Sequence, residues 1–373
     1  MENHPKVTVL FFGKIPPPYI GPAVATQKII NSKLKDQFNL VLFDISHHKS
    51  IDDLGKYNFS NVTSAMGQYW RLIKEIRRVK PDIVYMPSQQ TTIAYLRDIP
   101  FWMIVKLSGR KLICHLRGGY FRKWYENETP GWMKFLVRFW QKRIDAQIVL
   151  GDNLIQMYEP VMPRERIYVV PNAGDYDIPA VERAKDEKIK VLYLGNFIET
   201  KGVLDTLSAY HELNEETQEK VEFLFAGNWH EPETKQKMEE LAAKAAPNKI
   251  QFLGPVAGED KFRLLASCDI MVFPTFYRNE GHPWVLVESI AAGLAVISTD
   301  HAAVSQTVIY GFNGFLVAKN NPAEIARKVE ELVANPELME TMKDNSSELY
   351  QREFKEANNV ANFAKVFNAI ASK

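Results

Sequence analysis

The 373-residue chain has only two cysteines, Cys114 and Cys268, which are too few for a disulfide framework. Each lies in or beside an apolar run, where cysteine usually behaves as a small buried hydrophobe, so we expect a reducing, cytoplasmic setting. No stretch approaches the roughly 18 uninterrupted apolar residues of a membrane-spanning helix. The apolar run near the N-terminus is too short for the core of a signal peptide. The formal net charge of +1 argues against a protein that coats nucleic acid.

Several motifs of common enzyme classes are also missing. The chain contains neither G-x-G-x-x-G nor G-x-x-x-x-G-K-[ST], which disfavours dehydrogenases and P-loop nucleotide hydrolases. No group of His, Cys and Asp has the spacing of a metal site. The Asp-Tyr-Asp at 175–177 follows Pro-Asn-Ala-Gly, so we interpret it as turn and hinge rather than as metal ligands.

Short apolar runs alternate with longer helix-patterned segments along the whole chain. Near-continuous apolar runs of this length are typical of parallel strands covered on both faces, and their number predicts two doubly wound α/β domains. A polar, proline-containing stretch at 171–184 is the best linker between them. Residues 357–373 carry one apolar helical stripe, which predicts a C-terminal helix that crosses back to the first domain. The expected strands are residues 7–12, 40–44, 83–86, 112–115, 146–150, 167–170, 191–194, 223–226, 251–253, 270–274, 295–298 and 315–317.

The most informative stretch is residues 279–299, NEGHPWVLVESIAAGLAVIST. It follows an expected strand, Pro283 is placed like a first-turn helix proline, and Gly293 is a good C-terminal glycine. A helix that starts just beyond a parallel strand offers N–H groups to an anion. Glu280 and Glu288 flank this helix start, where their carboxylates suit hydrogen bonds from sugar hydroxyls. Two solvated helix-end glutamates are the plainer alternative.

This stretch resembles the E-x7-E element of retaining glycosyltransferases with the GT-B fold, family 4 (glycosyl transferases group 1). The resemblance covers nearly the whole chain, because further segments follow the family pattern in order: PPPYIGPAVATQKI, DAQIVLGDNL with IYVVPNAGD, YLGNFIETKGVLDTLSAY, FLFAGNW, QFLGPV, CDIMVFPT and VIYGFNGFLV. It implies two facing Rossmann-like domains, 1–175 for the acceptor and 176–356 for the donor, with a helix at 357–373. It also implies transfer from a nucleotide-diphosphate sugar with retention of configuration, no bound metal and no cofactor.

The resemblance carries site residues over to this chain. Lys201 matches the lysine at the donor diphosphate, Glu288 the carboxylate at the ribose, and Gly21 the glycine that lets backbone approach the phosphates. Glu280, with the backbone that follows it, matches the group that holds the donor sugar. The implied catalytic set is Glu280, Lys201 and either His115 or Arg117. The implied donor-binding set is Gly21, Gly195, Asn196, Lys201, Gly227, Glu280, Gly281, His282, Trp284, Val285 and Glu288.

The chain departs from the family pattern at three places. Asn196 stands where the family usually has an arginine, so a second phosphate-binding cation must come from elsewhere, with Lys14, Arg117 and Arg278 as candidates. Gln306 replaces a common glutamate. Near 112–116 the family usually presents a histidine to the reacting sugar. Here His115 and Arg117 fall on the same side of the strand, and a buried structural histidine is an alternative for His115.

The region from Lys106 to Arg143 combines ten basic residues and two acidic ones with tryptophans and other aromatics. This composition suits peripheral contact with an anionic membrane, while a core helix pair whose basic residues face water is the alternative. Residues 1–175 carry a net charge of +10 and residues 176–373 a net charge of −9. We therefore expect a retaining glycosyltransferase in polysaccharide or glycolipid biosynthesis. Its acceptor is a glycan or a lipid-linked glycan. The alternatives are a non-catalytic GT-B scaffold partner and a sugar-nucleotide epimerase or hydrolase.

Overall fold

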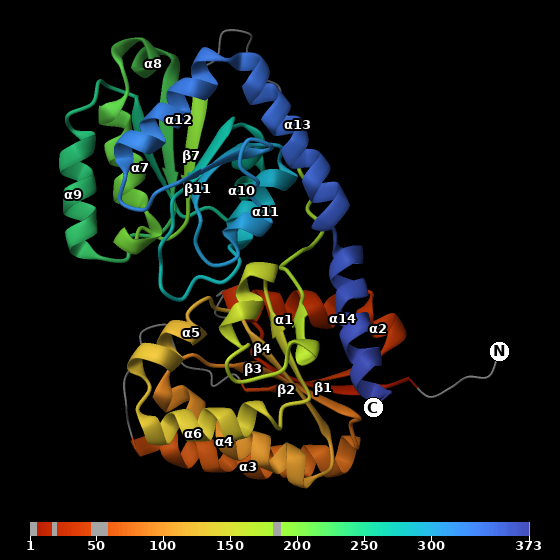
Figure 1. Cartoon of the computed structure of the whole chain (residues 1–373). Helices are drawn as coiled ribbons and strands as arrows, with labels where there is room; N and C mark the ends of the chain where they lie inside the picture. The colour runs from red at the N-terminus through yellow and green to blue at the C-terminus, as the bar shows by residue number, and fades with distance from the viewer. Residues whose placement is uncertain (1–5, 17–20, 46–58, 182–187, 373) are drawn as a thin grey trace. The chain divides into compact units, whose positions relative to one another are not determined.

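The computed structural model describes residues 6–16, 21–45, 59–181 and 188–372, and it divides into two compact units (Figure 1). Unit 1 is Met1–Gly174 with Glu356–Lys373, and unit 2 is Asp175–Lys355. The domain boundaries expected from the sequence fall after residues 175 and 356. Residues 17–20 of the expected proline-glycine loop and residues 182–184 of the expected linker lie outside the described part of the chain.

Unit 1 is built on a parallel six-stranded sheet with the order β2-β1-β3-β4-β5-β6. All six apolar runs of the first half of the sequence form its strands. The strands are β1 (Thr8–Gly13), β2 (Asn39–Asp44), β3 (Ile83–Ser88), β4 (Lys111–Leu116), β5 (Ala146–Val149) and β6 (Ile167–Val169).

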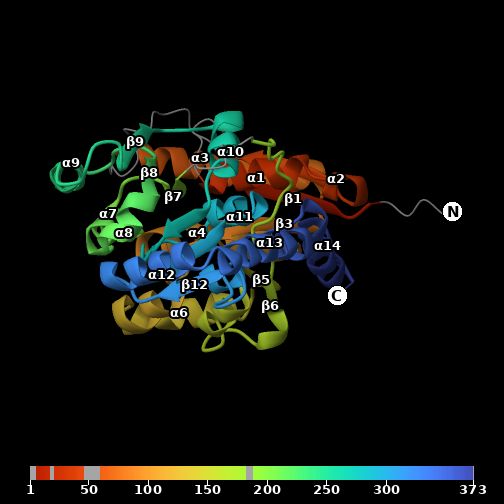
Figure 2. The same ribbon diagram turned by 90° about the horizontal axis from the view of Figure 1, so that it is seen from above.

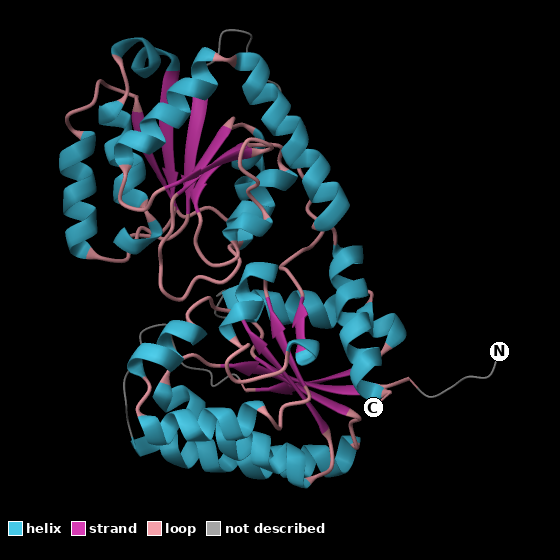
Figure 3. Ribbon diagram, viewed as in Figure 1, coloured by secondary structure: helices cyan, strands magenta, loops and turns pink. Residues whose placement is uncertain are grey.

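Helices cover both faces of this sheet (Figures 1 and 3). One face carries α1 (Gly21–Asn31), α2 (Leu34–Gln37) and the C-terminal helix α14 (Glu356–Ala371), whose Phe363 and Phe367 share a core cluster with Phe11 of β1 and Tyr85 of β3. The expected return of the C-terminal helix to the first domain is therefore confirmed. The other face carries α3 (Phe59–Val79), α4 (Thr92–Leu107) and α6 (Gly131–Gln141). Short α5 (Phe121–Lys123) and the 3-10 and π turns η2 (Trp124–Glu128), η3 (Asp152–Met157) and η4 (Arg164–Arg166) complete the unit.

Helix α4 lies between α3 and α6 in this layer, as two views agree (Figures 1 and 2). Tyr69 of α3 packs on Phe101 of α4 with ring centroids 4.5 Å apart. On the other side Trp102 of α4 packs on Trp140 of α6, with centroids 6.1 Å apart. The three helices thus form one continuous layer.

Unit 2 repeats the architecture with a parallel sheet of order β12-β11-β10-β7-β8-β9. Its strands are β7 (Ile189–Leu194), β8 (Val221–Ala226), β9 (Ile250–Gly254), β10 (Ile270–Phe273), β11 (Ala295–Thr299) and β12 (Gly314–Val317). These confirm the six runs expected in the second half. The helices that pack together on one face are α7 (Val203–Glu212), α9 (Pro232–Ala242) and α12 (Pro322–Ala334); α10 (Gly258–Ala266), α11 (Trp284–Ala291) and α13 (Pro336–Glu353) pack on the other (Figure 3). Shorter elements are α8 (Glu215–Lys220), η5 (Glu199–Lys201) and η6 (Val304–Gln306).

Asn-Pro pairs start two of these helices. The side chain of Asn321 accepts a hydrogen bond from the Glu324 N–H at the start of α12, and Asn335 accepts one from the Leu338 N–H at the start of α13. A proline follows each asparagine at the first helical position, where its missing N–H costs nothing. Pro283 differs from the expectation, because it is the N-cap of α11 and the helix begins only at Trp284.

Strand order locates the functional edge of unit 2. The chain runs from β7 outward to β8 and β9, and then returns to the other side of β7 with β10. The winding therefore reverses between β7 and β10. In open α/β sheets ligands bind outside the carboxyl ends of the strands at such a switch point. The loops that follow β7 and β10 are thus the first place to look for a site.

Candidate functional site

Lys201 lies in the turn between β7 and α7, at this switch point. The next residue, Gly202, has φ +79°, and a Cβ there would lie 2.4 Å from the carbonyl oxygen of Pro274. Only glycine fits both the left-handed backbone and this close approach. The turn is therefore packed directly on the end of β10, and this contact fixes the position of Lys201.

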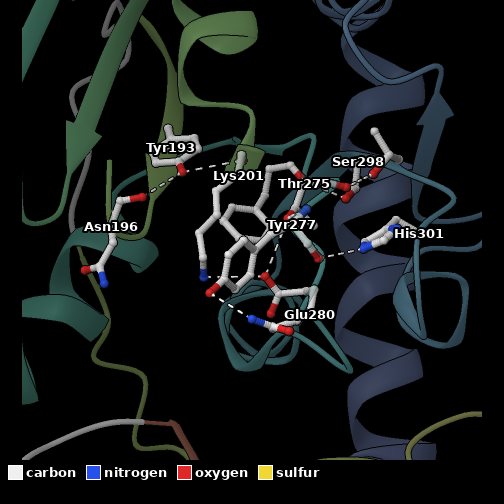
Figure 4. Close-up of polar contacts among 11 residues, drawn as sticks. Tyr193, Asn196, Lys201, Thr275, Tyr277, Glu280, Ser298 and His301 are labelled. Atoms are coloured by element: carbon white, nitrogen blue, oxygen red, sulfur yellow. Dashed lines mark hydrogen bonds and ion pairs between the residues drawn. The ribbon is translucent and has the colours of Figure 1, made fainter. Parts of the chain in front are cut away.

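Glu280 approaches Lys201 from the loop that follows β10 (Figure 4). The Lys201 Nζ lies 3.4 Å from the Glu280 Oε2, and the two side chains are 20% and 14% exposed. Thr275 donates its hydroxyl to the same carboxylate at 3.4 Å, and the Lys201 Nζ lies 5.2 Å from the ring centroid of Tyr277, within cation–π range. The site thus presents one ammonium and one carboxylate, both largely shielded from water.

Three hydrogen bonds, two from residues at or just beyond the end of β11 and one to η5, hold the Glu280 loop in place. Thr299, at the end of β11, donates its hydroxyl to the carbonyl of Thr275. His301 donates from Nε2 to the carbonyl of Tyr277 at 2.8 Å (Figure 4). The Phe276 N–H donates to the Thr200 carbonyl at 2.9 Å, next to Lys201. A site held in this way is preorganised, so it loses little entropy when it binds a ligand.

The second carboxylate of the E-x7-E element has its own lysine. Glu288 on α11 is 8% exposed, and its Oε1 lies 2.6 Å from the Nζ of Lys261 on α10. The plainer alternative of a solvated glutamate is wrong for Glu288. Lys261 was missed by the sequence reasoning, because it lies 27 residues before Glu288 and only the packing of α10 on α11 brings the two together.

In the sequence, the start of α11 lies between Glu280 and Glu288. Pro283 supplies no side-chain cap to α11, and the first turn of this helix carries the positive end of the helix dipole. The neighbouring Gly281 is buried, and its carbonyl accepts a hydrogen bond from the Ala303 N–H at 2.8 Å. Such a helix start can hold an anion such as a phosphate.

The side chain of His282 is directed into unit 2. Its Nε2 lies 2.6 Å from the Thr307 hydroxyl, and burial lowers the pKa of its imidazole to about 3. A neutral, 3% exposed imidazole anchors this loop to Thr307, next to η6, so the side chain of His282 is not exposed to a ligand.

Gly195 and Gly227 allow the backbones that follow β7 and β8 to pack closely together. A Cβ on Gly227 would lie 1.8 Å from the carbonyl oxygen of Gly195, and a Cβ on Gly195 would lie 3.1 Å from the Phe273 ring. The backbones that leave β7 and β8 therefore approach each other as closely as glycine allows. Asn196, next in the chain, is exposed, and its carbonyl accepts from the Tyr193 hydroxyl at 3.2 Å (Figure 4).

The three cations considered as substitutes for the missing arginine fall in different places. Arg278 is an exposed residue of the same loop as Glu280. Lys14 is exposed just beyond β1 of unit 1, and Arg117 lies just beyond β4 of unit 1. Only Arg278 therefore shares a unit with Lys201. Gln306 is half-buried in η6.

His115 and Arg117 meet at one tyrosine of unit 1. The Nδ1 of His115 lies 2.6 Å from the Tyr85 hydroxyl, and the Arg117 Nη2 donates to the same hydroxyl at 3.2 Å. His115 is 1% exposed, and its ring lies 6.1 Å from Phe363 of α14. Burial first, and then the charge of Arg117, hold the pKa of His115 well below its usual value. The histidine is thus a neutral core residue, and Arg117 is the more accessible of the two.

Gly21 is the first residue of α1, and a Cβ there would meet nothing within 4 Å. The fold of unit 1 therefore does not itself require glycine at this position. A requirement for glycine there would come from something that the chain binds.

The sequence of unit 2 matches a known family. Residues 176–349 match the family described as "Glycosyl transferases group 1". This part of the chain belongs to that family. The matched residues include the four charged residues that form the two ion pairs of the site, which are Lys201, Lys261, Glu280 and Glu288.

Relatives and solved structures extend the likeness over the chain. An uncharacterized glycosyltransferase of Methanocaldococcus jannaschii, MJ1069, is 23% identical over 82% of this chain and 79% of its own. Phosphatidyl-myo-inositol mannosyltransferase of Mycolicibacterium smegmatis is 28% identical over 49% of this chain and 46% of its own. The structure of Anabaena Alr3699/HepE in complex with UDP aligns with a TM-score of 0.71 at 14% identity, over 97% of this chain and all of that one. At this identity the likeness shows the fold, which is GT-B.

Neither a cluster of metal ligands nor a membrane-spanning helix is present in the described part of the chain. The described residues contain no group of three or more His, Cys, Asp or Glu placed to hold a metal ion. In the same part of the chain no helix is long and apolar enough to cross a membrane.

Proposed function

We propose that this protein is a retaining glycosyltransferase that transfers a sugar from a nucleotide-diphosphate donor to a glycan or lipid-linked glycan. The observation that carries the proposal is the Lys201–Glu280 pair, 3.4 Å apart at the switch point of a unit that belongs to the glycosyl transferases group 1 family. A carboxylate next to an ammonium suits a ligand with hydroxyls beside a phosphate. A sugar nucleotide is such a ligand.

The donor is a nucleotide-diphosphate sugar, in line with the UDP and UDP-glucose that occupy the Anabaena HepE structures. Lys201 and the first N–H groups of α11 hold the diphosphate, and Glu280 accepts hydrogen bonds from the sugar. Glu288, oriented by Lys261, accepts from the ribose hydroxyls. The donor is a substrate, and the proposed reaction involves neither a resident cofactor nor a metal.

The reaction breaks the bond between the anomeric carbon and the diphosphate oxygen. It forms a bond between that carbon and the acceptor hydroxyl oxygen on the same face, so configuration is retained. The proton of the acceptor hydroxyl passes to the leaving diphosphate. Lys201 offsets the negative charge that grows on the diphosphate, which is the role of a preorganised cation in a shielded site. Of the two candidates in unit 1, Arg117 is the one that a ligand can reach, because His115 is buried.

We further propose that the acceptor is reached in the cytoplasm, with the protein at the periphery of an anionic membrane. The mycobacterial relative is named as a transferase that acts on phosphatidyl-myo-inositol, which is a lipid. The basic, aromatic region from Lys106 to Arg143 suits such a setting. Polysaccharide or glycolipid biosynthesis is the corresponding role.

The experiment begins with thermal stabilisation of the full chain by UDP, GDP, ADP and their common glucose and mannose derivatives. A ligand that binds only the native state raises the melting temperature. The best donor is then incubated with candidate acceptors, and NMR assigns the anomeric configuration of the product. We expect Glu280→Gln and Lys201→Met to lower turnover by a hundredfold or more, whereas the exposed-lysine control Lys220→Met leaves it unchanged.

Three outcomes would contradict the proposal. An inverted product would refute retention. Donor binding without turnover in every acceptor assay would favour a scaffold. Donor conversion without acceptor that is lost in Glu280→Gln would favour an epimerase or hydrolase.

A further inference from the structure

Large apolar side chains are exposed on one layer of unit 1. Ten large hydrophobic residues are exposed among the described residues, and seven of them lie on α3, α4 and α6. The layer is continuous, with α4 in the middle (Figures 1 and 2). A concentration of this kind marks an interaction surface. The seven residues are Trp70, Ile93, Met103, Leu107, Trp132, Phe135 and Phe139.

Helix α4 is apolar on both its inner and its outer side. Its inner side buries Tyr95, Trp102 and Val105. Its outer side carries apolar residues at positions 93, 96, 100, 103 and 107, with alternating spacings of three and four that place them in one stripe. Leu107 is 82% exposed. A surface helix of a globular protein normally turns a polar face outward, so this apolar outer stripe is suited to contact with another molecule.

Helix α6 repeats the pattern with aromatic residues. Met133, Val137 and Trp140 are buried, and Trp132, Phe135 and Phe139 are 58%, 69% and 37% exposed. Their spacing of three and four forms a second exposed stripe.

A cation accompanies the aromatic stripe of α6. The guanidinium carbon of Arg143 lies 3.4 Å from the centroid of the Phe139 ring. Arginine beside exposed aromatics is the composition of a helix that lies in a membrane interface.

Charge decides which occupant fits. The ranges of α3, α4 and α6 contain eight Lys or Arg and two acidic residues, a net charge of +6. Both acids are paired, Glu75 with Arg78 and Asp98 with Arg97. A second copy related by a two-fold axis would bring an equal positive charge against this face. An anionic surface would not.

We infer that the outer face of the α3–α4–α6 layer lies on an anionic lipid bilayer, with Trp132, Phe135 and Phe139 inserted among the headgroups. This inference deepens the membrane contact of the proposed function and rests on it, although the binding needs no transfer chemistry. The inserted groups are the aromatic side chains of α6 rather than its two basic side chains, which already donate hydrogen bonds within unit 1. Lys134 donates to the carbonyl of Glu126 at 2.8 Å, and Arg138 donates to the hydroxyl of Tyr125 at 2.7 Å.

The test is sedimentation of the full chain with vesicles of phosphatidylcholine alone and with 30% phosphatidylglycerol. We expect binding only to the anionic vesicles and at least a tenfold weaker partition for Phe135→Ala/Phe139→Ala. The matched control is Ile309→Ala/Tyr310→Ala, which removes two exposed apolar side chains from unit 2 and should bind like the wild type. Glu280→Gln should also bind normally, so a failed transferase assay and a failed membrane assay are separable.

Three results would overturn the inference. One is absence of binding to anionic vesicles. Another is equal binding of Phe135→Ala/Phe139→Ala and the wild type to anionic vesicles. That result would mean that charge alone holds the protein on the bilayer and that the aromatic side chains do not insert. The third is a wild-type dimer that Phe135→Ala/Phe139→Ala dissociates, seen by analytical ultracentrifugation, which would identify a second copy as the cover.

Discussion

Replacement of Lys261 by methionine should destabilise the α10–α11 pair of unit 2. The change keeps most of the side-chain volume but leaves the carboxylate of Glu288, whose side chain is 11% exposed, without its ammonium partner 2.6 Å away. Removal of one partner from a fully buried pair costs about 3–5 kcal/mol. Because the Lys261 side chain is 23% exposed, we expect roughly half of that, about 2 kcal/mol.

The chain offers a matched control at the same distance. Lys220 and Glu216 on α8 are also 2.6 Å apart, but their side chains are 50% and 80% exposed. Solvent screens such a pair, so Lys220→Met should have no measurable effect on stability. Burial is the main difference between the two pairs, and a contrast between them therefore measures what burial does.

Hydrogen exchange followed by mass spectrometry is the appropriate assay, because it reports the stability of each segment in a chain with two units. A loss of about 2 kcal/mol speeds exchange in peptides from α10 and α11 about thirtyfold. Glu288→Gln and the double variant complete a cycle, in which the two single changes should cost more in sum than the double change. Additive costs, or equal effects of Lys261→Met and Lys220→Met, would refute the reasoning.

Three further predictions follow from other parts of the structure. Gly227→Ala places a Cβ 1.8 Å from the Gly195 carbonyl oxygen and should cost at least about 3 kcal/mol in thermal or denaturant unfolding, whereas Gly131→Ala, where nothing lies within 4 Å, should not. Gly21→Ala should leave the free energy of unfolding within about 0.5 kcal/mol of the wild type, because a Cβ there meets nothing within 4 Å. Burial raises the pKa of Asp98 to about 6, above its unfolded value near 4. Between about pH 6 and pH 4 the Asp98 carboxyl is protonated in the folded state but ionised in the unfolded state, so the cost of the buried charge disappears as pH falls through this window. Asp98→Asn should therefore stabilise the protein by about 2–3 kcal/mol at pH 7.5 but not at pH 4.

The strands could be predicted because both sheets are parallel and covered on both faces. A strand buried on both sides reads as a continuous apolar run, and twelve such runs became twelve strands. Their ends were less certain: β3 extends to Ser88, two residues beyond the expected Met86, because pairing with β4 continues as far as Leu116. Hydrophobicity alone does not reveal where a ladder of hydrogen bonds stops.

The sequence predicted those site residues that stand in local motifs, but not the contacts that arise from packing of distant segments. Lys201 and Glu280 stand in local motifs, and the loops that carry them follow adjacent strands, so the sequence identified both. Lys261 stands in no motif, and its partnership with Glu288 arises from packing of two helices. The burial of His115 was equally hidden, because the ring that covers it, Phe363, comes almost 250 residues later in the chain.

Charge separates the two units more sharply than the sequence halves suggested. The return of α14 gives unit 1 a net charge of +12 and leaves unit 2 with −11. The diphosphate that we propose for unit 2 would therefore meet a net negative unit, yet exposed charges beyond about 8–10 Å are largely screened at physiological ionic strength. Local geometry must then provide the attraction, and Lys201 with the start of α11 is the cationic group at the switch point. The membrane contact that we propose for unit 1 has the opposite requirement, since an anionic membrane presents an extended field of negative charge. A net charge of +6 spread over one helical layer suits that field, whereas a single lysine would not.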